Sequence, residues 1–167
     1  MFIICCTQKL FKRTRLTVEP LLTNSTNALG NWYADLLFVN RYQMLLFVNE
    51  NSRLAIITPA KEARSMTKHL TQHLTEFLQT MQVPQGWIDA EIQEMQENHF
   101  SKTNSRSVLG TMNDYRYQIE WRIHDTGVAS PLDLTMHLRD CPCGPLKYAS
   151  PFALTFGFLK DRYENRL

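Results

Sequence analysis

The sequence predicts an α+β fold, with an N-terminal antiparallel sheet of three or four strands packed against about five helices. Two observations lead to this prediction. Apolar runs of strand length alternate with short polar turns up to residue 58, and apolar residues recur at helical spacing from residue 61 to residue 163. No repeat, low-complexity tract or linker interrupts this order. We therefore expect one domain over residues 1–167, with strands mainly in 2–58 and helices mainly in 61–163.

Four segments have the character of strands. Residues 2–7 (FIICCT) are almost wholly apolar, which is typical of a central strand. Three further apolar runs, at 32–39, 44–48 and 54–58, are separated by the polar turns NRYQ and NENSR. Such short turns join antiparallel neighbours, because parallel neighbours need a crossover of about a dozen residues. A short extended piece is also expected over residues 16–22.

Five segments have the character of helices. The first, residues 61–82, carries an apolar stripe formed by Met66, Leu70, Leu74, Phe77, Leu78 and Met81. A second helix is expected over 87–98, and a third from about 107 to a stop at Gly127, with Ser107 or Asn104 as its cap. Ser130-Pro131 and Ser150-Pro151 each combine a capping serine with a proline in the first helical position, and so predict two short final helices.

Composition and charge exclude several classes of protein. The chain has 18 basic and 16 acidic side chains, a net charge of +2, so no strong global field attracts nucleic acid or membrane. The N-terminal apolar stretch is too short for a secretory signal, and no run approaches the length of a spanning helix. We expect a cytoplasmic protein with reduced thiols and no membrane partner. The sequence predicts neither its oligomeric state nor the identity of its partner.

Two sets of residues were considered as metal ligands. Cys5-Cys6 and the pair Cys141 and Cys143 lack the two to four intervening residues usual between zinc ligands. The histidines in His69-Leu-Thr-Gln-His73, with Glu76, share one helix face, but the glutamate of zinc peptidases is missing beside the first histidine. No phosphate-binding loop, dinucleotide motif or nucleophile elbow is present. We therefore expect no metal and no cofactor, with this histidine helix as the weak alternative.

The polar segment before the third helix is the candidate functional site. Helix N-termini present unpaired N–H groups and a partial positive charge, so they suit anions. Lys102 and Arg106 add charge, and Thr103 and Ser107 add hydroxyl donors. The alternative is structural, with Ser107 as a cap and Arg106 paired with an acid. A glycine inside a helix lowers the stability of the helix relative to alanine. We expect that close packing against the sheet explains the presence of Gly110.

Residues 102–114 also carry a resemblance. The run K-T-x-x-R-S-V-L-G-x-M-N-D resembles the signature of a bacterial and phage family of unknown function, as do CTQKL at 6–10 and N-x-L-G-x-W-x-A at 27–34. The family has no established activity, so the resemblance implies positions and no mechanism. The positions it adds to the ligand-binding candidates Lys102, Thr103, Arg106 and Ser107 are Lys9, Trp32 and Asn113.

These features give three hypotheses. The first is an interaction module that is not an enzyme and holds an anionic ligand, a nucleic-acid phosphate or an acidic partner at residues 102–114, consistent with an accessory role in a mobile element or defence system. The second is a metal-independent nuclease of toxin or defence type, with His99, Lys102 and Arg106 as working groups and Asp114 as a further candidate acid or base. The third is that the motif only joins helix to sheet.

Overall fold

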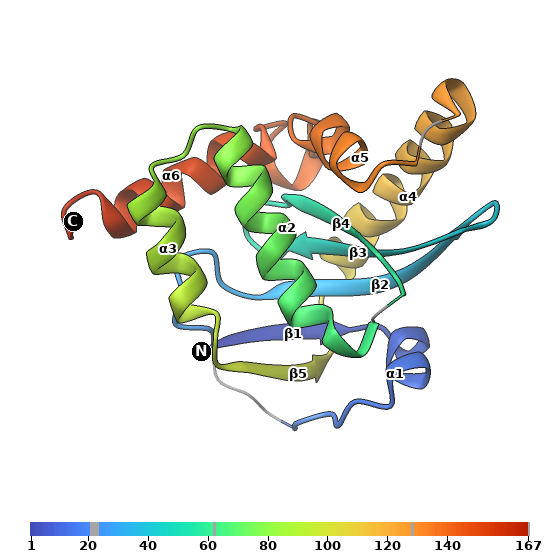
Figure 1. The fold of residues 1–167 in the computed structure, drawn as a ribbon, viewed down its shortest axis with the longest axis horizontal. Helices are drawn as coiled ribbons and strands as arrows, with labels where there is room; N and C mark the ends of the chain where they lie inside the picture. Colours follow the sequence, from blue (N-terminus) through green and yellow to red (C-terminus); the bar gives the residue numbers. More distant parts are fainter. Residues whose placement is uncertain (21–23, 62, 128, 167) are drawn as a thin grey trace.

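The computed structural model describes residues 1–20, 24–61, 63–127 and 129–166, and confirms the α+β class (Figure 1). The described residues form five strands: β1 (Phe2–Cys6), β2 (Trp32–Val39), β3 (Tyr42–Asn49), β4 (Ala55–Pro59) and β5 (Asn98–Lys102). They also form six α-helices: α1 (Gln8–Thr14), α2 (Met66–Thr80), α3 (Gln85–Glu94), α4 (Arg106–Thr126), α5 (Pro131–Leu138) and α6 (Pro151–Tyr163). Short 3-10 turns occur at Ala63–Ser65 and Gly144–Leu146.

The strands form one mixed sheet in the order β4-β3-β2-β1-β5. The antiparallel arrangement expected for β2, β3 and β4 is confirmed, since both hairpins pair in that sense. β1 instead lies parallel to both of its neighbours, with Cys6 opposite Ala34 of β2 and Lys102 of β5. Residues 7–31 are long enough for the crossover that a parallel β1–β2 pair needs, and the chain from β4 to β5 supplies a second one.

Two elements were missed in the sequence. β5 lies in a stretch assigned to the end of a helix and a polar approach, because its half-buried residues show no apolar alternation. α1 has seven residues, too few to display a stripe, and is held by its N-cap Thr7. Within the expected extended piece at 16–22, the N–H of Glu19 donates to the carbonyl of Phe100 (2.9 Å), and residues 21–22 lie outside the described part.

The sheet has a hydrophobic core on each face. On one face Phe2, Ile4 and Cys6 of β1 pack with α2, α3 and α6, and on the other Ile3 and Cys5 pack with α4 and α5. Figure 1 shows α2 and α3 in front of the sheet and α4 behind it. β1 is therefore buried on both faces, as its sequence indicates. No helix in the described residues is long and apolar enough to cross a membrane.

The predicted helix ends are largely confirmed. Ser130 and Ser150 cap α5 and α6 through their hydroxyl groups, and Gly127 ends α4 in the left-handed conformation. The cap of α4 is Ser105, whose hydroxyl accepts from the N–H of Val108, and not Ser107 or Asn104 as expected. The first helix turn therefore starts one residue after this serine, at Arg106.

A buried carboxylate joins α3 to the loop before β2 and to α6. Glu91 is fully buried, and its oxygens accept hydrogen bonds from Nδ2 of Asn27 (2.6 Å), the N–H of Ala28 (3.0 Å) and the N–H of Leu29 (3.1 Å). The hydroxyl of Tyr163 donates at 2.7 Å. Burial and the Glu91 carboxylate raise the pKa of Tyr163, so this hydroxyl remains a donor.

We expect Glu91→Gln to destabilise the protein by about 3 kcal/mol, because the amide keeps one acceptor and places an NH2 group among four donors. Urea unfolding followed by circular dichroism measures the loss. Gln93→Ala, an exposed change on the same helix, should alter stability by less than about 0.5 kcal/mol. Equal effects of the two substitutions would contradict this role for Glu91.

Candidate functional site

β1 and β5 are parallel neighbours, and the chain continues from their ends toward opposite faces of the sheet. After β1, α1 packs on the face of α2 through Leu10, and after β5, α4 packs on the opposite face through Val108. Such a switch point leaves a crevice at the carboxyl ends of the two strands, where ligands of open α/β sheets bind. Cys6 and Lys102 lie opposite each other at these ends. The candidate segment 102–107 therefore begins at the switch point.

A cavity of about 650 Å³ lies at this end of β5. We call it the strand-end hollow, and it is lined by Val18, Glu19, Pro20, Ser101, Lys102, Thr103 and Asn104. The backbone bond from Glu19 to Phe100 holds residues 18–20 along the outer edge of β5. Of the residues predicted as ligand-binding, Lys102 and Thr103 line this hollow.

The predicted residue Lys9 lies in the first turn of α1, on the other side of the switch point. Its Nζ is 3.8 Å from Oδ1 of Asp35 and 5.8 Å from the ring centroid of Phe38. The hydroxyl of Thr7 donates to the same carboxylate oxygen at 2.6 Å. Since the Lys9 side chain is 52% exposed, its charge is still available to a ligand, although Asp35 offsets part of it.

Two buried side chains, one from β2 and one from the β3–β4 turn, hold the start of α4 by hydrogen bonds. The hydroxyl of Tyr33 donates to Oδ1 of Asn104 and accepts from the N–H of Ser105 (3.1 Å). Burial is the main cause of the raised pKa of Tyr33, so its proton is retained. The hydroxyl of Ser107 accepts from Nη2 of the buried Arg53 at 3.1 Å. Ser107 thus has a structural contact, whereas it was expected to bind a ligand.

The later motif residues do not line the strand-end hollow. Arg106 and Asn113 are exposed on α4, and Oδ1 of Asn113 accepts from Nη2 of Arg116 at 2.9 Å. Asp114 lines a different cavity, of about 300 Å³, beside the loop that contains Cys141. Gly110 is exposed too, and a methyl group there would meet nothing within 4 Å. The expected close packing of Gly110 is wrong, because the sheet-facing side of α4 is formed by other residues.

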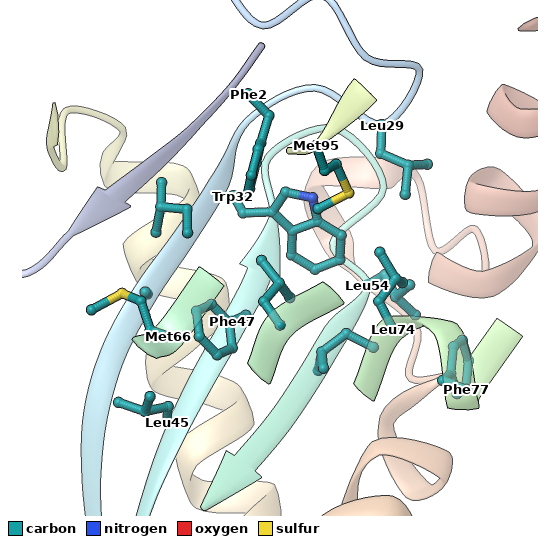
Figure 2. Packing of buried hydrophobic residues seen from close by; sticks show 14 of the residues in the cluster. Phe2, Leu29, Trp32, Leu45, Phe47, Leu54, Met66, Leu74, Phe77 and Met95 are labelled. Atoms are coloured by element: carbon teal, nitrogen blue, oxygen red, sulfur yellow. The ribbon is translucent and has the colours of Figure 1, made fainter. Parts of the chain in front are cut away.

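Trp32 lies in the core and not at the candidate site. Its side chain is fully buried among Phe2, Leu29 and Met95 (Figure 2). The family resemblance made Trp32 a ligand-binding candidate, but its position in a strand that is buried on both faces determines its environment.

Two of the three nuclease candidates, His99 and Lys102, cannot contact the same small site. In β5, His99 lies opposite Ile3 and Lys102 lies opposite Cys6, so their side chains belong to opposite faces of the sheet. Nδ1 of His99 is 2.9 Å from Oε2 of Glu19, and its Nε2 is 3.2 Å from Oε1 of Glu97. Both ring nitrogens are therefore engaged by carboxylates.

Among the described residues no group of three or more His, Cys, Asp or Glu side chains is placed to hold a metal ion. In the candidate histidine helix, Nδ1 of His73 lies 3.8 Å from Oε2 of Glu76, and His69 has a half-buried position. Burial raises the pKa of Cys5 and of Cys6 to about 12, which keeps both thiols protonated.

Sequence reasoning missed several residues of the site. Glu19 and its neighbours Val18 and Pro20 carry no local signal, because a contact across some 80 residues brings them to β5. Tyr33 could have been found, since its polar tip needs a partner when a strand buries the ring. The sequence suggests Asn104 as a helix cap, but its Oδ1 instead accepts a hydrogen bond from the hydroxyl of Tyr33.

The fold and site define an α+β protein with a switch-point crevice. Residues 3–154 match the model of a family described as a domain of unknown function (DUF6933), and the chain therefore belongs to this family. The match includes β2 to β5, all of β1 except Phe2, and the whole strand-end hollow. No curated protein and no solved structure matches the chain.

We expect Gly110→Ala to stabilise the protein by up to about 1 kcal/mol, because alanine is the better helix former and has free space there. Gly127→Ala is the matched control. It should destabilise by a similar amount, since φ at Gly127 is +68°. Urea unfolding measures both. A loss of stability in Gly110→Ala would show that the helix needs this glycine for packing.

His99 should make stability depend on pH. Hydrogen bonds to Glu97 and Glu19 raise the pKa of His99 above the ordinary 6.5, so its stabilisation is complete below that value and is lost as the pH rises through the folded-state pKa. His99→Gln should therefore lower the midpoint of thermal unfolding relative to wild type at about pH 5.5, with little difference at about pH 8.5. A difference that grows toward high pH would contradict the proposed ion pairs.

Proposed function

We propose that this protein is a binding module that is not an enzyme, and that it holds an anionic group, a phosphate or a carboxylate of its ligand or partner, in the strand-end hollow. One observation carries the proposal: the cavity beside Lys102, Thr103 and Asn104 coincides with the switch point between β1 and β5. Open sheets with parallel strands bind ligands at such points.

The chemistry of the hollow suits an anion. Lys102 is exposed, and it has no ion-pair partner within the part of the chain that the structure describes. Thr103 supplies a hydroxyl, and Nδ2 of Asn104 is a donor because its Oδ1 already accepts from Tyr33. The acid in the lining, Glu19, is offset by its contact with His99.

The start of α4 adds a second source of positive potential. Ser105 satisfies the N–H of Val108, while no described protein group accepts from the N–H of Arg106 or of Ser107. The exposed guanidinium of Arg106 stands on the same helix turn. An anion near Lys102 would therefore gain from both the helix dipole and the two cations.

The other hypotheses receive less support. A nuclease would need His99 and Lys102 at one phosphodiester, and they lie on opposite faces of β5. A purely structural motif accounts for Ser105 and Ser107 but not for the exposure of Lys102, Arg106 and Asn113. We also propose that residues 102–114 are a family signature. The same proposal includes a setting in a bacterial or phage mobile element or defence system.

The test is titration of the labelled protein with inorganic phosphate, followed by two-dimensional NMR. We expect saturable shifts of the amide signals of residues 101–107. Lys102→Ala combined with Arg106→Ala should weaken the apparent affinity about tenfold or more, because each removes a charge-assisted contact. The thermal midpoint should change little, since both side chains are exposed and unpaired within the described residues.

Lys160→Ala is the matched control. It removes an exposed lysine whose Nζ is 3.9 Å from Oε1 of Glu164 on α6, far along the chain from the hollow. It should leave the phosphate-induced shifts unchanged. Shifts that spread over all exposed lysines, or a double variant that binds as the wild type does, would refute the strand-end site.

A further inference from the structure

A second cavity lies where the β2–β3 turn meets α1 and the start of α5. It has a volume of about 470 Å³, and we call it the hairpin pocket. Three cations line it, from three separate parts of the chain: Arg13 in the last turn of α1, Arg41 in the β2–β3 turn and Lys61 after β4. The pocket is at the Tyr42 end of β3, opposite the end that carries Asn49. Figure 1 shows the β2–β3 hairpin projecting there beyond the rest of the sheet.

The two arginines of the pocket contact polar and aromatic side chains. Nη2 of Arg13 donates to Oε1 of Gln43 at 3.5 Å, and the guanidinium of Arg41 lies 5.4 Å from the ring centroid of Tyr42. Within the described residues neither arginine, nor Lys61, has a carboxylate partner. Besides Arg13, residues 8–15 (QKLFKRTR) contain three more cations and no acid. Within the described part of the chain no acid neutralises the positive charge around the pocket, so this charge favours an anion from outside.

Three other arginines of the protein are paired with acids. Nη2 of Arg122 is 3.1 Å from Asp133, Nε of Arg139 is 3.3 Å from Asp140, and a third pair joins α6 to α3 at 3.5 Å. The molecule thus has acids that pair with surface arginines at several places. Like charges close together repel, and three of them around one pocket without an acid favour a site that is completed by an anionic ligand.

Other lining residues of the hairpin pocket are apolar or aromatic. Tyr42, Met44 and Pro131 contribute an aromatic ring, a thioether chain and a proline ring, which we call the apolar floor of the pocket. Its volume lies in the range of small-molecule sites, about 300–1,000 Å³. A ligand that fits both the apolar lining residues and the three cations has a planar, weakly polar ring and one or more phosphate groups. Arginine suits phosphate because its planar fork can donate two hydrogen bonds.

We propose that the hairpin pocket binds a nucleotide, with the base against Tyr42 and Met44 and the phosphates between Arg13, Arg41 and Lys61. This site is independent of the strand-end hollow, since the two cavities share no lining residue. Binding here adds a small-molecule ligand to a protein whose proposed function is to hold an anionic group elsewhere.

The test is isothermal titration calorimetry with the diphosphates of adenosine, guanosine, cytidine and uridine, and with pyrophosphate and the unphosphorylated nucleosides as probes. At least one nucleoside diphosphate should bind saturably. Pyrophosphate should bind about tenfold or more weakly, because it leaves the apolar floor empty, and the nucleosides should not bind measurably. Pyrophosphate binding as tightly as every diphosphate would overturn the assignment of the base.

Arg13→Gln and Arg41→Gln should each weaken the best diphosphate about tenfold, and Tyr42→Leu should weaken it without changing pyrophosphate. Lys12→Gln is the matched control, because it removes an exposed cation of α1 outside the pocket. The Lys102→Ala, Arg106→Ala double variant should bind the diphosphate normally, so the two sites fail or succeed separately. Equal weakening by Lys12→Gln, or no saturable binding of any probe to the wild type, would refute the proposal.

Discussion

The parallel pairing of β1 with both neighbours is the constraint on which the rest of the structure depends. A strand in this position is covered on both faces, and its five residues are all buried. The chain must therefore leave its end by a crossover, and α1 provides one on the face of α2. β5 joins the same strand from the other side, and α4 then crosses the opposite face. The crevice at residues 102–104 is a consequence of these two exits.

The sequence predicts the parts of the fold that rest on local patterns. The apolar runs of β2, β3 and β4, and the Ser-Pro starts of α5 and α6, are confirmed because adjacent residues determine them. β5 and the parallel placement of β1 depend on partners far along the chain. An edge strand with four half-buried residues and one exposed residue has no alternation, and a central strand has the same apolar sequence in a parallel pair as in an antiparallel one.

The candidate site was predictable as a place but not as a set of residues. A polar segment before a long helix indicated the start of α4, because hydroxyl and amide side chains are preferred where a helix N-terminus must be capped. The same segment contains Ser105 and Ser107, which support the helix through Val108 and Arg53. Sequence shows the hydroxyl but not its partner, so ligand-binding and structural serines look alike before the fold is known.

Net charge was a poor guide to local charge. The value of +2 is a sum over the whole chain, in which acid-rich segments such as α3 balance the cations gathered near α1 and the β2–β3 turn. Screening limits the reach of each charge to about 10 Å at physiological salt, so a ligand responds to the nearby groups and not to the total. Where pairs form, as between Arg162 and Glu94, the field is cancelled locally. Arg13, Arg41 and Lys61 line one cavity, and the residues that the structure describes place no acid in its lining. A protein with a net charge of +2 can therefore present a locally cationic surface.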